Sequence, residues 1–173
     1  DDLASAIALL KQLPGRVLFG LGKLAELGES ARAAGAGKVL LVSDPGIIAA
    51  GHVNRAVESL QRARVSVVVF DRVAENPTTD HVLDGVALAR AQGVDFIIAL
   101  GGGSAMDCAK GINLLLTNGG QVADYWGINK AVQPMLPSMA VPTTAGTGSE
   151  AQSFALISDA VTHRKMACGD RRL

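Results

Sequence analysis

The sequence predicts an α/β protein with a doubly wound, mostly parallel sheet and a β-hairpin at its C-terminal end. Three observations predict this class. Apolar residues make up 49% of the 173 residues, aromatic residues only 3%, and 20 residues are glycine. Continuous apolar runs, typical of strands buried on both faces, alternate with segments of helical periodicity. Short turns with glycine or proline separate them. We expect one domain over residues 1–173, with a core at about 16–150 and a hairpin extension at about 151–173.

The first half of the chain is predicted to alternate strands and helices. The runs KVLLVSD and VSVVVF are continuous and apolar, which is typical of buried parallel strands. Between them, Val53, Ala56 and Leu60 recur at helical spacing. In chain order, we expect a short strand at 15–20, a helix at 23–35, a strand at 38–44, a helix at 52–64 and a strand at 65–70.

The second half continues the alternation and then changes. After the break at ENPTT, a helix is predicted to end at Gly93, and the apolar run DFIIAL predicts the next strand. Right-handed crossovers would place these strands in one parallel sheet. In chain order, we expect a helix from 78–80 to 93, a strand at 95–100, a helix at 104–118, a short strand from about 137, and hairpin strands at 154–159 and 164–168.

Composition excludes several partner classes. Sixteen basic residues balance sixteen acidic ones without a basic run, so we expect neither nucleic acid nor a membrane surface as a partner. No apolar stretch approaches the roughly 20 residues of a membrane-spanning helix. Cys108 and Cys168 have no disulfide or zinc spacing, which favours a reducing, cytoplasmic compartment. The N-terminus does not resemble a signal peptide. It does not begin with Met, however, so the sequence leaves open whether a leader segment has been removed.

Two glycine-rich turns are candidates for binding a phosphate. The first, GLGKLA at 20–25, matches the G-x-G-x-x-G/A dinucleotide pattern, and Asp44 follows at about the distance expected for a ribose-binding acid. The second, Gly101 to Gly103, fails that pattern because Met106 stands at the third glycine position. It follows a longer apolar strand, however, and offers consecutive unhindered amides before a helix. We favour the second turn.

Polar residues around the second turn have alternative roles. Ser104 and Asp107 fit a capping-box variant at the start of a helix. Lys110 lies one turn further on and is either a phosphate-neutralising or an exposed lysine. A second distinctive stretch, VPTTAGTGSE, supplies hydroxyl groups and glycines, which favours contact with a ligand. Asn76 follows a strand, and composition alone favours a turn-forming role for it.

Taken in order, the stretches FDRVAENPTTD, ALGGGSAMDCAKG, VPTTAGTGSEA and RKM resemble the iron-containing alcohol dehydrogenases. These belong to a superfamily that includes glycerol dehydrogenases and dehydroquinate synthase. The resemblance runs from about Val17 to the last residue, and GGGS in place of GGGK points to the alcohol, diol or lactaldehyde branch. It implies a Rossmann-like NAD-binding domain for this chain. The helical, metal-holding domain of the family is expected to lie outside these 173 residues.

The resemblance implies a site for NAD. Asp44 would bind the adenosine ribose hydroxyls, and its carboxylate would repel the 2′-phosphate of NADP, which is therefore less favoured. Asn76 would line the cofactor groove. The other implied cofactor-binding residues are Gly102, Gly103 and Ser104 at the pyrophosphate, Asp107 in shaping that turn, Thr143, Thr144 and Thr147 in the cleft, and Lys165 reaching across from the hairpin.

The resemblance also implies Fe²⁺ or Zn²⁺ in the full-length protein, held by one Asp and three His beyond this chain. His52, His81 and His163 match none of these ligand positions, so we assign no catalytic or metal-binding residue here. The implied reaction is hydride transfer between a primary or secondary alcohol, or a diol, and its aldehyde or ketone. We expect the chain alone to bind cofactor without oxidising alcohol, and the parent protein to be a homo-oligomer.

Two alternatives stay open at this point. One is a stand-alone nucleotide-binding or regulatory module without dehydrogenase activity. The other is a phosphosugar-handling lyase related to dehydroquinate synthase, which would also need metal ligands from a second domain. The stretch PTTAGTGSE fits the alcohol dehydrogenase branch better.

Overall fold

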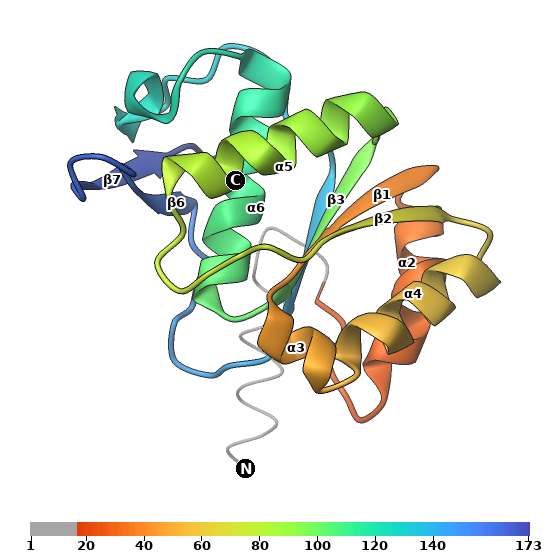
Figure 1. The fold of residues 1–173 in the computed structure, drawn as a ribbon. Helices are drawn as coiled ribbons and strands as arrows, with labels where there is room; N and C mark the ends of the chain where they lie inside the picture. Colours follow the sequence, from red (N-terminus) through yellow and green to blue (C-terminus); the bar gives the residue numbers. More distant parts are fainter. Residues whose placement is uncertain (1–16) are drawn as a thin grey trace.

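The computed structural model describes residues 17–173, and its main sheet has four parallel strands. The predicted α/β class and mostly parallel sheet are confirmed (Figure 1). In spatial order the strands are β2 (Ser66–Phe70), β1 (Lys38–Val42), β3 (Phe96–Gly101) and β5 (Ser138–Pro142). The chain therefore passes from β1 outward to β2 and then returns to the other side of β1.

Helices cover both faces of this sheet, as a doubly wound fold requires (Figure 1). Within β1, Val39 and Leu41 belong to one hydrophobic cluster, while Leu40 and Val42 belong to the other. This two-sided burial explains why the strand is a continuous apolar run. The first cluster includes α2 (Leu27–Ala33) and α4 (His52–Arg62), and the second includes α5 (Thr79–Gln92) and α6 (Gly103–Asn118). Within the described residues, no helix is long and apolar enough to cross a membrane.

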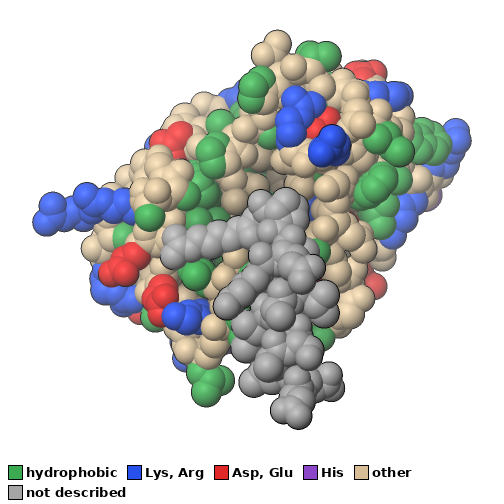
Figure 2. Space-filling view, turned by 180° about the vertical axis from the view of Figure 1, so that it is seen from behind, with side chains coloured by type: hydrophobic (Ala, Val, Ile, Leu, Met, Phe, Trp, Pro, Cys, Tyr) green, Lys and Arg blue, Asp and Glu red, His purple; other side chains and the backbone are tan. Residues whose placement is uncertain are grey.

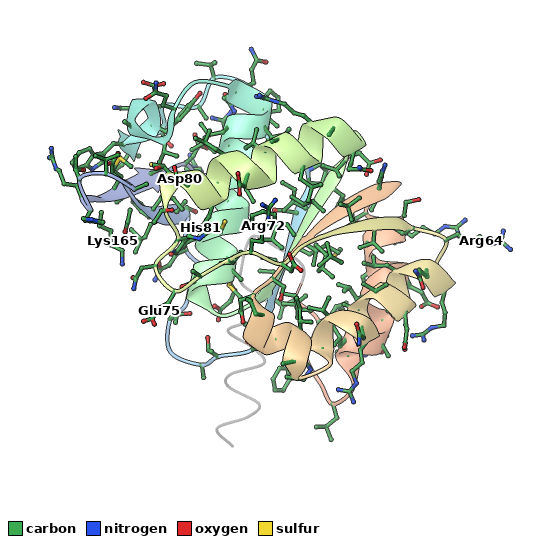
Figure 3. All side chains as sticks on the ribbon, in the orientation of Figure 1. Arg64, Arg72, Glu75, Asp80, His81 and Lys165 are labelled. Carbon is green, nitrogen blue, oxygen red and sulfur yellow. The ribbon has the colours of Figure 1, made fainter. Side chains whose placement is uncertain are left out.

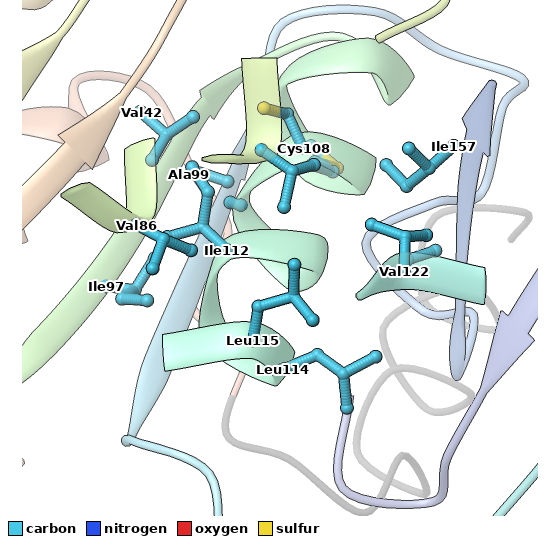
Figure 4. Close-up of a cluster of buried hydrophobic side chains, with 14 of the residues drawn as sticks. Val42, Val86, Ile97, Ala99, Cys108, Ile112, Leu114, Leu115, Val122 and Ile157 are labelled. Atoms are coloured by element: carbon cyan, nitrogen blue, oxygen red, sulfur yellow. The ribbon is translucent and has the colours of Figure 1, made fainter. Parts of the chain in front are cut away.

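The predicted hairpin is confirmed, and it belongs to a second sheet that packs on α6. Strands β6 (Phe154–Ser158) and β7 (Lys165–Gly169) pair antiparallel. Ile157 joins Ile112, Leu115 and Val122 in the cluster beside α6 (Figure 4). The sequence did not predict β4 (Gly127–Ile128), which adds to β7 in parallel, or the short 3-10 helix η2 (Val122–Tyr125) before it. A strand of two residues has too few positions to show a period.

The predicted strand at 15–20 is wrong over its described part, since residues 17–20 form no strand. Its first two residues, and the expected core start at 16, lie outside the described residues. Val17, Leu18 and Phe19 are all more than 40% exposed. An apolar pattern alone does not supply the neighbouring strand that a ladder needs. The helix that follows begins as the 3-10 segment η1 (Lys23–Glu26) and becomes α-helical only at Leu27.

Charged side chains are distributed, as the balanced composition suggests. On the face shown in Figure 2, the Lys and Arg side chains are spread around the margin with Asp and Glu among them. Among residues 17–173, cation–π contacts occur between Arg72 and the Phe70 ring at 5.4 Å and between Arg164 and the Trp126 ring at 4.9 Å.

Helices α2 and α4 touch at a glycine. The N–H of Gly28 donates to Ser59 Oγ at 3.0 Å, and Ser59 Oγ donates to the carbonyl of Ala25 at 2.7 Å. A Cβ atom on Gly28 would collide with the backbone carbonyl of Ser59 and lie 2.9 Å from Ala63 Cβ. The close approach of the two helices therefore requires glycine at this position.

We expect Gly28→Ala to lower the free energy of unfolding by about 1–3 kcal/mol, because the added methyl overpacks the contact between α2 and α4. Urea denaturation followed by circular dichroism measures this. Glu29→Ala is the control, since Glu29 is an exposed neighbour on α2 and its loss should change stability by less than about 0.5 kcal/mol. Equal stability of Gly28→Ala and the unmodified chain would contradict the packing described.

Candidate functional site

The carboxyl ends of β1 and β3 form the point where the strand order reverses. In open α/β sheets this switch point is where ligands bind. Ser43 joins the two strand ends, because its Oγ donates to the carbonyl of Leu100 at 2.7 Å. A Cβ atom on Gly101 would lie 3.2 Å from Asp44 Oδ2, so this carboxylate lies directly beside the glycine turn. The structure thus brings together two features that the sequence separates by more than fifty residues.

Asp44 is held in place by a short helix. It is the N-cap of α3 (Pro45–Ala49), and its Oδ1 accepts a hydrogen bond from the N–H of Ile47 at 3.1 Å. The side chain is half-buried. Its orientation is therefore set by the backbone, before any ligand arrives.

The glycine turn leads into α6, the longest helix in the described part of the chain. Gly102 is the N-cap, in an extended conformation, and no side chain caps the helix. The first amides of a helix have no acceptor within it, and the helix dipole gives them a partial positive charge. The N–H groups of Gly103, Ser104 and Ala105 are in this position, which suits an anion.

The predicted capping box of Ser104 and Asp107 is wrong. Helix α6 begins at Gly103, one residue earlier than expected, so Ser104 lies inside the first turn and cannot be its N-cap. Ser104 Oγ instead accepts a hydrogen bond from the N–H of Asn76 at 3.3 Å. Asp107 Oδ1 accepts one from Ser149 Oγ at 2.9 Å. Both side chains therefore bind other segments to α6.

A loop at 143–149, which we call the threonine loop, lies across the glycine turn. The N–H of Thr143 donates to the carbonyl of Gly101 at 2.9 Å, continuing the pairing of β5 with β3. A Cβ atom on Gly102 would lie 3.3 Å from Thr144 Oγ1, and one on Gly103 would lie 3.4 Å from Thr147 Cβ. Any side chain on either glycine would fill the space between the turn and the loop.

Asn76 and Lys165 lie on the third side of the turn. Asn76 has a left-handed backbone, with φ of 53°, which fits the turn-forming role that composition favours. Its Oδ1 accepts a hydrogen bond from Lys165 Nζ at 3.0 Å. Figure 3 shows Lys165 on the same side of the molecule as Glu75, the neighbour of Asn76. The segment after β2, the start of α6 and the hairpin therefore meet here.

Lys110 has a role that the sequence did not indicate. Its Nζ donates to three backbone carbonyls, those of Ser149 at 2.7 Å, Gln152 at 2.5 Å and Phe154 at 3.0 Å. Burial lowers the pKa of Lys110, although the charges of Asp107 and Glu150 oppose this. Burial raises the pKa of Asp107, although the hydrogen bond from Ser149 and the charge of Lys110 act to lower it. Lys110 is thus neither an exposed lysine nor one aimed at the glycine turn.

The first glycine pattern lacks the surroundings of a phosphate site. No described strand precedes GLGKLA, and it leads into η1, which has only four residues. Gly22 is needed for its left-handed φ of 72°, and a Cβ atom there would meet nothing within 4 Å. The turn therefore shapes the entry into α2.

Within residues 17–173, no group of three or more His, Cys, Asp or Glu side chains is placed to hold a metal ion. His81 is a capping residue of α5, since its Nδ1 accepts a hydrogen bond from the N–H of Thr78 at 3.0 Å. His163 lies in the hairpin turn. Cys108 is buried, and burial raises the pKa of its thiol to about 12, so it stays protonated at neutral pH.

Comparisons with known proteins agree on one family. The model of that family, described as iron-containing alcohol dehydrogenase, matches residues 14–173. Alcohol dehydrogenase 4 of Schizosaccharomyces pombe is 43% identical over 159 residues, 92% of this chain and 38% of that protein. NAD-dependent methanol dehydrogenase of Bacillus methanolicus is 34% identical over 161 residues, 93% of this chain and 42% of that protein. The crystal structure of a 1,3-propanediol oxidoreductase matches with a TM-score of 0.86 and 36% identity, covering 90% of this chain and 41% of that one. The chain thus spans less than half the length of these relatives.

Proposed function

Because this chain belongs to the iron-containing alcohol dehydrogenase family, we propose that it is the NAD-binding domain of a metal-dependent oxidoreductase. The whole protein would interconvert an alcohol or diol and its aldehyde or ketone. The observation that carries this proposal is the bare glycine turn at the switch point, bounded by Asp44 on one side and the threonine loop on the other.

The residues at the switch point fit the diphosphate of a dinucleotide. The amides at the start of α6 can donate to phosphate oxygens, and the helix dipole favours the negative charge. Gly102 and Gly103 carry no Cβ atom, so no side chain of the turn itself stands between a phosphate and these amides. Thr144 and Thr147 line the opposite side and carry hydroxyl groups that can also donate.

Asp44 fits the adenosine ribose. A carboxylate accepts hydrogen bonds from the two ribose hydroxyls, and its charge repels the 2′-phosphate of NADP. Asn76 and Lys165 would complete the groove beside the turn, with Lys165 adding a positive charge near the phosphates. When bound, NAD supplies the nicotinamide ring that accepts or returns a hydride.

The metal implied by the family finds no matching ligand set in the described part of the chain, so no step through a metal is assigned to these residues. NAD as the cofactor is supported by the relative from Bacillus methanolicus, which is named as NAD-dependent. An alcohol or diol as substrate is supported by the names methanol dehydrogenase and 1,3-propanediol oxidoreductase. The homo-oligomeric state, the cytoplasmic location, and cofactor binding without alcohol oxidation by these 173 residues stay predictions.

We expect Gly102→Val to weaken NAD binding by at least roughly tenfold, because its branched side chain would occupy the space beside Thr144. Isothermal titration calorimetry on the 173-residue chain measures this. Gly22→Val is the matched control. It strains a left-handed position and should lower stability while leaving the affinity for NAD unchanged. The reverse pattern, with affinity lost at Gly22 and kept at Gly102, would move the site to the first glycine turn.

We expect Asp44→Asn to lower the ratio of NAD affinity to NADP affinity by roughly tenfold or more, because the repulsion of the 2′-phosphate is lost. Asn is also a good N-cap, so this variant keeps the start of α3. Asp44→Gly serves as a second variant that also removes the ribose acceptor, and it should lower NAD affinity further. Titration of both cofactors into each variant gives the ratios. A ratio unchanged in both variants would remove Asp44 from the ribose contact.

A further inference from the structure

The threonine loop is attached to the rest of the molecule through very few side chains. Within residues 17–173, the hydrogen bonds that join 144–152 to other segments are made by Asp107 and Lys110 alone. The other bonds of this stretch are internal, such as those of Gln152 Nε2 to the carbonyl of Thr147 and of the Ala151 N–H to the carbonyl of Gly148. The loop itself holds two glycines in left-handed conformations and is largely exposed. Beyond Thr143, which continues the pairing of β5 with β3, the position of the loop therefore depends on α6.

Lys110 is the stronger of the two attachments. An ammonium group has three donors, and Lys110 donates to three carbonyls between Ser149 and Phe154. These carbonyls lie between the threonine loop and β6, in a stretch with no regular structure at Gln152. A lysine whose three donors are all engaged in this way has none left to donate to a phosphate oxygen.

Asp107 and Lys110 hold the same residue from one face of α6. Three residues apart, they are neighbours on the helix surface. Asp107 accepts a hydrogen bond from the hydroxyl of Ser149, and Lys110 donates to its carbonyl. Ser149 is only 4% exposed. This buried serine is the point at which the C-terminal end of the loop is fixed, two residues after Thr147.

We propose that Lys110, acting with Asp107 on Ser149, is a positioning residue that sets where the threonine loop lies against the glycine turn. NAD affinity would then depend on a lysine that does not touch the cofactor. This inference rests on the proposed function, because it assumes that NAD binds at the glycine turn beside that loop. Its physical basis is that the first two turns of α6 carry both the phosphate-binding amides and the anchor of the opposite wall. One rigid helix therefore holds both the glycine turn and the threonine loop.

The test compares Lys110→Met with the unmodified chain in two measurements. Without cofactor, hydrogen exchange of the Ser149 and Ala151 amides, which are hydrogen-bonded within the loop, should become at least roughly tenfold faster, because the loop loses its bonds to Lys110. By calorimetry, the affinity for NAD should fall at least roughly tenfold. Lys38→Met is the matched control, since Lys38 is half-buried like Lys110, bonds to Gln92 and lies at the opposite end of the sheet. It should change neither measurement.

Ser149→Ala is a second variant, which removes only the bond to Asp107 and keeps Lys110. It should shift both measurements in the same direction, by less, and it decides the question if Lys110→Met fails to fold. A loop that exchanges at the unmodified rate, or a faster loop with unchanged NAD affinity, would overturn the inference and leave the proposed function standing. A chain that binds no NAD in any form would overturn the proposed function itself, and this inference with it.

Discussion

The arrangement of the site depends on one constraint, which is that the backbone at Gly102 and Gly103 carries no side chain. This space is bounded by Thr144 at 3.3 Å and Thr147 at 3.4 Å from the positions that Cβ atoms would take. Glycine costs conformational entropy, and a sequence keeps it where the backbone must be approached closely. The helix that starts here has no side-chain cap, so its first amides have no acceptor within the helix. The packing of the threonine loop and the proposed contact with phosphate therefore both depend on these two glycines.

The rest of the structure holds the segments around this turn in register. The parallel pairing of β1, β3 and β5 brings Asp44, the glycine turn and the threonine loop to one edge of the sheet. Specific hydrogen bonds then fix their distances, from Ser43 to Leu100, from Asn76 to Ser104 and from Lys165 to Asn76. Each bond joins segments that are far apart in the sequence. The site is thus assembled by tertiary contacts on a rigid parallel sheet.

The sequence predicted what depends on local pattern. KVLLVSD and DFIIAL were readable as strands because both of their faces are buried, and the glycines after the second strand indicated a turn open to a ligand. Prediction from the sequence failed where a residue's structure or role depends on residues far away along the chain. The described part of the strand predicted at 15–20 did not form, and the N-cap of α6 is Gly102, two residues before Ser104. The carbonyls that engage Lys110 lie 39 to 44 residues further along the chain, so spacing around Lys110 could not reveal them.

The central claim is that a dinucleotide places its diphosphate against the amides of Gly103, Ser104 and Ala105. It is tested most directly by following backbone amide signals of the ¹⁵N-labelled chain during a titration with NAD. The account predicts the largest shifts at Gly102 to Ala105, with smaller shifts at Thr144 and Thr147. Shifts concentrated instead at Gly20 to Lys23, with the start of α6 unchanged, would contradict it.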